Sequence, residues 1–407
     1  QQKKMLSENG LSFEDLIRRV ESRPDNQEAV ELLRRQQPLM GPEGEKILAE
    51  MEADAAKFDA EEEKKKAEAE RNQKLARETA ILWHRHKQSF HGLDLSGLDL
   101  SALDFSGADF SAALLEKTNF YGSCLQGCVF KDALAQETNF SRADLSRADL
   151  SGATAPQCNF VGTRLVGLRA INADLTGSDF STAEFAAVDL SGALLNEARL
   201  QGANFQQLQG NGASFEKAEL AAANFTDASL KEARFNEARL QQACFSGADC
   251  EKAEFYAVQA EAARFDGCNL DETRSGEAAD FTEASFVRAR IGKATWDGAV
   301  LSRAKLNEAL LDLSDFSRAR FDGACLVRAS AKETVFDKSC LDQADLFGIN
   351  LFRGSLRMAS LRGTRLQHAN CHGVDFYQTD PDLTALPAVA EGSLLDNTLL
   401  QLRRGLS

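Results

Sequence analysis

The sequence predicts an all-β solenoid with helical segments at both ends. Leu or Phe occupies 30 of the 37 positions found at every fifth residue from Leu95 to Ser275. The residue two places earlier is small, with Ala at 34 of 57 sites along the whole repeat. Helices repeat every 3.6 residues and strands every two, so a period of five indicates a stacked repeat array instead. We expect one core, stretched along an axis.

The repeat extends from residue 91 to residue 376 and changes frame once. Ser275 and Phe281 are six residues apart, whereas the other core positions are five apart. One extra residue in a ladder acts like a β-bulge, so we expect a kinked or widened corner here. A second irregular point lies at Leu208–Gly212, where Gly210 stands in place of the large core residue.

Residues 1–90 predict a helical lead-in and residues 377–407 predict a cap. From Glu43 to about Gln88 the chain lacks Pro and is rich in Ala and charge, which predicts one long helix over 43–88. The leucines between Leu394 and Leu402 predict a short amphipathic helix that covers the exposed last coil. Gln1 precedes the first Met, Met5, so we expect a processed or recombinant piece of a longer chain.

Composition favours a cytosolic protein without catalytic machinery. The nine Cys, an odd number, mostly occupy repeat positions where a small apolar side chain fits, which favours a reduced compartment. No apolar run is long enough for a signal peptide or a membrane span. The motif His368-x-x-Cys371-His372 places Cys371 inward and both histidines outward, so we expect no metal there. We expect no cofactor and no enzymatic activity.

The motifs GADFS, RADLS, GANFQ and AANFT resemble the pentapeptide-repeat family. The resemblance implies a right-handed quadrilateral β-helix with one pentapeptide per side and four per coil, hence about 14 coils. Residues 20 apart then stack, and two ladders of Phe rings form the core. One ladder contains Phe120, Phe140, Phe160 and Phe180, and the other contains Phe185, Phe205, Phe225, Phe245 and Phe265. Glycines after the core position, such as Gly97 and Gly152, suit turns with positive φ.

Three groups of residues are candidate sites. Aromatic side chains beside Arg are typical of binding hot spots, which marks a protein-binding surface of Phe347, Phe352, Arg353, Arg357, Arg362 and Arg365. An alternative is that the Leu-rich tail covers these aromatics. An acidic, mobile loop is expected around the frame change, with Asp271, Glu272, Glu277, Asp280 and Glu283. The long helix either projects or docks on the array through Phe58, Leu75, Ile81, Leu82 and Trp83.

We hypothesise a rigid protein-interaction scaffold in the bacterial cytoplasm. The junction RETAILWHRHKQSFHGLDLSGLDLSALDFSGADFSAALLEKTNF, residues 77–120, resembles certain type VI secretion accessory proteins, which implies a secreted effector, a toxin or a secretion-spike protein as partner. One alternative is a DNA-mimicking topoisomerase modulator, and another is a secreted effector that acts on a host surface. The repeat holds 39 acidic and 28 basic residues. Duplex DNA of that length carries about 40 charges, so mimicry and nucleic-acid binding are disfavoured.

Overall fold

The computed structural model describes residues 63–66 and 76–381, and the chain divides into two compact units, Gln1–Thr79 and Ala80–Ser407. The described residues of the second unit include the whole repeat array. The predicted short helices before residue 43, most of the predicted long helix and the predicted Leu-rich cap lie outside the described residues.

Residues 63–66 and 76–85 are helical. The helix 76–85 ends in a Schellman motif, in which the Gln88 N–H donates to the Trp83 carbonyl (3.1 Å) and the Lys87 N–H donates to the His84 carbonyl (2.8 Å). Lys87 has the left-handed conformation that this motif needs, with φ 55°. The helix therefore ends before residue 88, and the chain turns directly into the first coil at Phe90.

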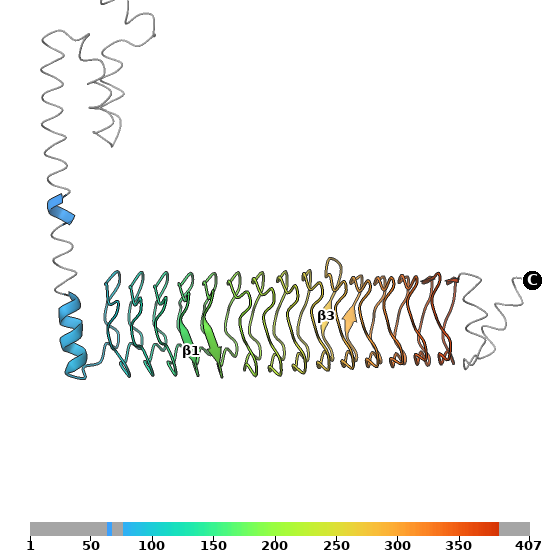
Figure 1. Cartoon of the computed structure of the whole chain (residues 1–407), viewed down its shortest axis with the longest axis horizontal. Coiled ribbons are helices and arrows are strands. Elements are labelled where there is room, and N and C mark those ends of the chain that lie inside the picture. The colour runs from blue at the N-terminus through green and yellow to red at the C-terminus, as the bar shows by residue number, and fades with distance from the viewer. Residues whose placement is uncertain (1–62, 67–75, 382–407) are drawn as a thin grey trace, which may run out of the picture. The chain divides into compact units, whose positions relative to one another are not determined.

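Each coil of the array contains 20 residues and bonds to the next in parallel register. Asp94 pairs with Leu114, and the pairing continues to Ser355 with Asp375. Between these pairs the core residue donates to the next coil, as Leu95 N–H does to the Leu114 carbonyl (2.8 Å). Figure 1 shows the coils stacked side by side from blue to red. The right-handed β-helix implied by the repeat is thus built from backbone bonds between coils.

The sides of the coils are too short for long strands. The six strands are β1 (Arg164–Val166), β2 (Glu184–Ala186), β3 (Arg274–Ser275), β4 (Thr295–Trp296), β5 (Ser360–Leu361) and β6 (Asp380–Pro381). They pair as β1 with β2, β3 with β4 and β5 with β6, all parallel. Other sides contribute isolated bridges because a turn follows every core residue.

Every corner is a turn that contains one left-handed residue. Leu98 N–H donates to the Leu95 carbonyl (3.2 Å), and Gly97 between them has φ 68°. A positive φ at this turn position is the type II signature. The expected positive φ is found at Gly97 and Gly152, but most corners carry Lys, Glu, Arg, Gln or Ala there, for example Lys252 (φ 62°). Register across the coils therefore overrides a cost of about 1–2 kcal/mol per left-handed L-residue.

The rings of the two predicted Phe ladders stack along the axis, except that Phe185 and Phe205 are tilted by 51°. Phe160 and Phe180 are 4.6 Å apart between centroids, and Phe225 and Phe245 are 4.7 Å apart. Two further ladders were missed by the sequence analysis, and they contain Phe90, Phe110 and Phe130, and Phe215, Phe235 and Phe255. Rings on opposite sides interlock edge to face across the core.

The pair of sides that carries most of the Phe rings changes partway along the array. Up to Phe180 most rings occupy one pair of opposite sides, and from Phe185 they occupy the other pair. Phe180 and Phe185 meet at the change with a tilt of 45°. β2, which contains Phe185, pairs with β1 of the preceding coil, but no bridge joins Glu184 to Asn204 of the next coil. The other sides keep their pairing, as Asp179 with Arg199 and Asp189 with Gln209, so the change of sides disturbs the backbone on one side only.

The extra residue at the frame change is Gly276. The register between coils is 21 residues here, as between Gln259 and Asp280. Gly276 is buried, and its carbonyl accepts the turn hydrogen bond from Ala279 (3.1 Å). In the next coil the large Trp296 is fully buried opposite the small Ser275. The frame change is therefore a corner with one inserted residue above a filled core.

At Gly210 the large and small core positions are exchanged. Leu208 occupies the position that is usually Ala, and it is buried. A Cβ added to Gly210 would lie 3.2 Å from Leu208 Cδ2 and 3.1 Å from Leu230 Cδ2. Leu208 thus fills the volume that the Gly leaves, and the same exchange occurs at Leu168 and Ala170.

This exchange predicts the outcome of a double-mutant cycle. Leu208→Ala leaves a cavity and should cost about 2–5 kcal/mol. Gly210→Leu overpacks the core and should cost about 1–3 kcal/mol. The double variant restores the common Ala-x-Leu pattern and should recover most of the loss. Urea unfolding followed by Trp296 emission, in a Trp83→Phe background, measures this. A double variant as unstable as the sum of the singles would contradict the exchange.

Asp and Asn side chains close the corners by accepting backbone hydrogen bonds. Asp109 lies just before core residue Phe110, and its Oδ1 accepts the N–H of Ser111 (3.0 Å). Where Ser214 stands at the equivalent place, Asn196 of the preceding coil accepts the Glu216 N–H instead (3.1 Å). The Asp or Asn before Leu or Phe in the repeat thus satisfies a corner N–H that the ladder leaves open.

These caps predict acid sensitivity. Hydrogen bonds from the Ser106 and Ser111 hydroxyls hold the pKa of Asp104 and of Asp109 below its usual value. A lowered folded-state pKa adds stability above the unfolded pKa, about 3.9, and this stability is lost as pH falls through the folded value. We expect the urea midpoint to fall below pH ~4. The variant Asp104→Asn/Asp109→Asn keeps a hydrogen-bond acceptor at both corners, so its urea midpoint should fall less at low pH than that of the unmodified chain. An equal fall in the two proteins would contradict the role assigned to these carboxylates.

Candidate protein-binding surface

One side of the last coils carries polar, uncharged residues between two aromatic corners. Ser330, Asn350 and Asn370 are paired in register on this side, which we call the asparagine face. Asn370 Nδ2 donates to Asn350 Oδ1 (3.0 Å). Asn350 Oδ1 also accepts the Phe352 N–H, at 3.2 Å. The Asn ladder therefore fixes the position of the backbone that carries an aromatic side chain at its border.

At one border of the asparagine face Phe347 is held between a histidine and an arginine. His368 meets the Phe347 ring edge to face at 5.0 Å. The Arg365 guanidinium lies 4.6 Å from the ring centroid and donates to Asp345 (3.0 Å). The Asp345 carboxylate also caps the Phe347 N–H (3.0 Å). Phe347 is half-buried by these contacts, with an apolar edge beside a fixed cation.

At the other border Phe352 stacks on His372, with centroids 5.6 Å apart and planes at 14°. Arg353 lies over the Phe352 ring at 5.0 Å. His372 N–H donates to Asn370 Oδ1 (3.2 Å), which joins this corner to the face. The two borders thus repeat one arrangement, in which Phe, His and Arg are in contact.

The six predicted surface residues do not form a single cluster. Phe347, Phe352 and Arg353 border the asparagine face, and Arg365 lies beside Phe347. Arg357 and Arg362 follow core residues Leu356 and Leu361, so they lie at the two corners away from that face. Arg357 instead pairs with Asp375 (3.2 Å) and covers the Tyr377 ring (5.1 Å).

Sequence reasoning missed His368, His372 and the two asparagines as members of this surface. The signal was present, because each histidine is about 20 residues from the Phe that it contacts. The tail that was expected to cover the aromatics lies outside the described residues.

The predicted acidic set at the frame change is held by hydrogen bonds and ion pairs. Asp271 pairs with Arg290 and accepts the Gly292 N–H, and Glu272 pairs with Lys252 and Lys293. Glu277 pairs with Arg318, and Glu283 pairs with Arg303. Asp280 accepts the Thr282 N–H. These contacts reduce the charge that a partner would meet. As a binding site, the set stays a prediction.

The residues of helix 76–85 that contact the first coils differ from those that were predicted. Ala80 is buried with the core, and the His84 ring meets the Phe105 ring at 5.4 Å. Leu82 is 52% exposed, and Trp83 is 39% exposed while its indole N–H donates to the Ser89 carbonyl (3.0 Å). Ile81 is half-buried, and Phe58 and Leu75 lie outside the described residues. Ala80 and His84 are four residues apart and share a helix face, whereas the apolar pair at 82 and 83 points elsewhere.

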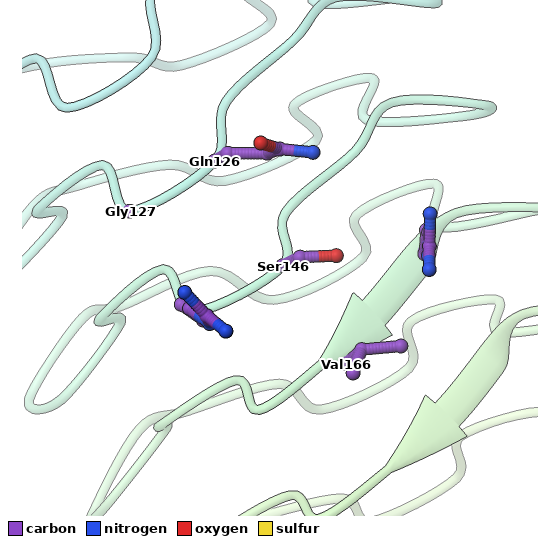
Figure 2. Close-up of a pocket in the computed structure, with 6 residues that line it drawn as sticks. Gln126, Gly127, Ser146 and Val166 are labelled. Atoms are coloured by element: carbon purple, nitrogen blue, oxygen red, sulfur yellow. The ribbon is translucent and has the colours of Figure 1, made fainter.

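Shallow grooves follow the corners of the array. The groove in Figure 2 has a volume of about 440 Å³, and Gln126, Ser146 and Val166 follow one another along it on successive coils. A second groove alternates Glu232, Lys252, Glu272 and Lys293. A third also mixes both signs of charge, with Arg303 and Arg320 beside Asp322 and Asp342. The second groove is lined by three Glu and four cations, and the third by three Asp and two Arg, so each mixes both signs of charge.

The histidines near Cys371 point away from it. Cys371 is buried in the core, and His368 and His372 contact Phe rings at the surface. Within residues 63–66 and 76–381 no group of three or more His, Cys, Asp or Glu side chains is placed to hold a metal ion. The deeper thiols are poor nucleophiles, because burial raises the pKa of Cys128 and of Cys158 to about 12.

Solved structures of other repeat proteins resemble this fold. A pentapeptide repeat protein involved in heterocyst differentiation regulation, from the cyanobacterium Nostoc sp. strain PCC 7120, is 23% identical over 70% of this chain and 95% of its own, with a TM-score of 0.17. A pentapeptide repeat protein of the Arabidopsis thaliana thylakoid lumen is 28% identical, and the match covers 28% of this chain and 70% of that protein, with a TM-score of 0.13. QnrB1, a plasmid-mediated fluoroquinolone resistance protein, is 17% identical, and the match covers 67% of this chain and 96% of QnrB1, with a TM-score of 0.16.

Family profiles match most of the array. The profile described as pentapeptide repeats (8 copies) matches residues 94–132, 123–160, 143–181, 279–318, 314–352 and 344–380. The profile described as pentapeptide repeat region matches residues 178–255. No curated protein matches the chain. No helix in the described ranges is long and apolar enough to cross a bilayer. Coils of 20 residues, left-handed corners and these matches together show that the chain belongs to the pentapeptide-repeat family.

Proposed function

We propose that this protein is a non-enzymatic, rigid scaffold that binds a protein partner through the asparagine face and its aromatic borders. The observation that carries the proposal is the repeated contact of Phe, His and Arg at both borders. Such side chains are enriched in binding hot spots. The Asn ladder and the corner hydrogen bonds hold them in place, so little conformational entropy is lost on binding.

The finer proposal is an adaptor that loads a secreted effector or toxin in a bacterial type VI secretion system, from the cytoplasm. The resemblance of residues 77–120 to accessory proteins of that system supports it. A rigid array suits such a role, because the partner-binding coils stay at a fixed distance along the axis from the first coil. Exposed Leu82 and Trp83 on helix 76–85 are available for a second contact.

The pairing of the surface carboxylates disfavours mimicry of DNA. Many carboxylates pair with a neighbouring Arg or Lys, as Glu308 does with Arg288 (2.8 Å). Others cap corner N–H groups, as Asp315 does for Ser317 (2.9 Å). A mimic needs a continuous run of uncompensated negative charge. The likeness to QnrB1 concerns the fold alone, so topoisomerase binding remains a secondary alternative, as does a secreted effector.

Affinity purification with matched variants tests the proposal. The tagged full chain and its Phe347→Ser/Phe352→Ser variant are used to capture proteins from bacterial cytosol, followed by mass spectrometry. The control is Tyr121→Ser/Tyr256→Ser, which removes two aromatics that are each 41% exposed at other corners. We expect a partner whose recovery falls at least about tenfold with the Phe variant, as expected for a loss of ~1.4 kcal/mol or more. The control should leave recovery unchanged.

Recovery that is equal for the Phe variant and the full chain would place the binding surface elsewhere. A secretion-spike protein or toxin among the proteins lost would support the adaptor role. Gyrase or topoisomerase subunits would instead support the alternative.

A further inference from the structure

We propose that the asparagine face binds a short, acidic segment of the partner protein. This inference rests on the proposed function and adds the chemistry of the partner. It follows from the distribution of charge along the array, from two arginines without ion pairs and from the hydrogen-bonding groups between them.

The sign of the charge changes along the array. Residues 91–280 contain 28 acidic and 14 basic side chains, whereas residues 281–376 contain 11 acidic and 14 basic ones. Residues 346–374 contain four Arg and no Asp or Glu. The asparagine face therefore lies in a basic section of an otherwise acidic protein. Opposite charge steers and orients a partner, so this section favours an acidic one.

Arg328 and Arg353 stand at opposite borders of the asparagine face, and both are exposed. Neither forms an ion pair with any residue in the described ranges. Arg353 lies over Phe352, and the Arg328 Cγ lies near Gly348, where an added Cβ would be 3.6 Å from it. Many arginines of the array are paired, as Arg318 is with Asp297 and Glu277, whereas Arg142, Arg147, Arg169 and Arg239 share with Arg328 and Arg353 the lack of an ion pair in the described ranges. Both guanidiniums are free of ion pairs and can bind carboxylates in bidentate geometry, although the charge of Arg328 also acts on Glu308 and Glu333 lies one coil before Arg353 at the same corner.

The groups between the two arginines suit a peptide. Asn350 and Asn370 present amides, and the rings of Phe347 and Phe352 supply apolar surface at each border. The face spans three coils, which is about 10 Å along the axis at the usual strand spacing. This length fits a segment of a few residues and is too short for the interface of a whole domain.

Neighbouring side chains disfavour a nucleic acid as the ligand. A nucleic acid strand extends beyond three coils in both directions. In the preceding coil it would approach the carboxylates of Glu308 and Asp312, which lie at the same two corners. Repulsion from these groups would oppose the gain at the arginines. A short acidic peptide can avoid them.

Fluorescence anisotropy with the full chain tests this inference. The probes are a short fluorescein-labelled peptide of Asp and Glu with one Leu, its Asn/Gln counterpart, and a single-stranded oligodeoxynucleotide of similar length. The test variant is Arg328→Gln/Arg353→Gln. The control variant is Arg288→Gln/Lys293→Gln, which removes two cations from the same corner columns, where Arg288 and Lys293 pair with Glu308 and Glu272. Trp296 emission verifies that each variant is folded.

We expect the acidic peptide to bind the full chain and the control alike, and the test variant at least about tenfold more weakly, since ~1.4 kcal/mol is tenfold. Binding should weaken as salt rises. An acidic peptide that does not bind, or that binds the test variant equally, would overturn the inference. So would tighter binding of the oligodeoxynucleotide. If the acidic peptide does not bind but capture of a partner still depends on Phe347 and Phe352, the scaffold role stands and only the proposal of an acidic partner segment is refuted.

Discussion

The parallel hydrogen bonding between residues 20 positions apart is the constraint on which the rest of this structure depends. Each side of a coil is only a few residues long, so it cannot satisfy its own backbone groups. The next coil satisfies them, as the Leu114 carbonyl does for Leu95. This register forces a turn every five residues with a left-handed residue in it, at Lys252 as well as at Gly97. It also brings every core side chain onto the one above it.

The frame tolerates local changes because the constraint acts on the backbone. At Gly210 the volume moves to Leu208, and at Phe180 and Phe185 the rings move to the other pair of sides. At Gly276 one residue is inserted, and the register is 21 for one coil before it returns to 20. At Gly210 and Gly276 the neighbouring coils remain hydrogen-bonded, and at Phe185 one side loses its bridge to the next coil while the other sides keep theirs. The outward residues can vary just as freely, and this allows one face to carry a binding surface.

The frame was predictable from the sequence because the repeat period is itself a structural distance. Core positions, ladders and left-handed corners follow from counting in fives and twenties. The candidate surface was predicted less well. Phe347 and Phe352 were found by composition, whereas His368 and His372 required the 20-residue register to be applied to surface residues. Arg357 was grouped with them by proximity in sequence, although it lies at a different corner and pairs with Asp375.

Ion pairs were the least predictable part, because Arg318 reaches Glu277, which is 41 residues away, across two coils. Contacts of the helix were also missed, since they depend on which helix face meets Phe105 and not on which residues are most apolar. A scaffold role requires that the array behave as one body. The irregular points at Gly210 and Gly276 are where it would first separate into independent pieces.

Native-state hydrogen exchange of the free chain tests this rigidity most directly. The account predicts slow exchange at core-residue amides from Phe90 to Leu356 except Phe185, without a break at Leu208–Gly212 or Ser275–Phe281, because those amides donate to the next coil. Fast exchange confined to either segment would contradict it, and would show an array of separately stable pieces joined by flexible corners.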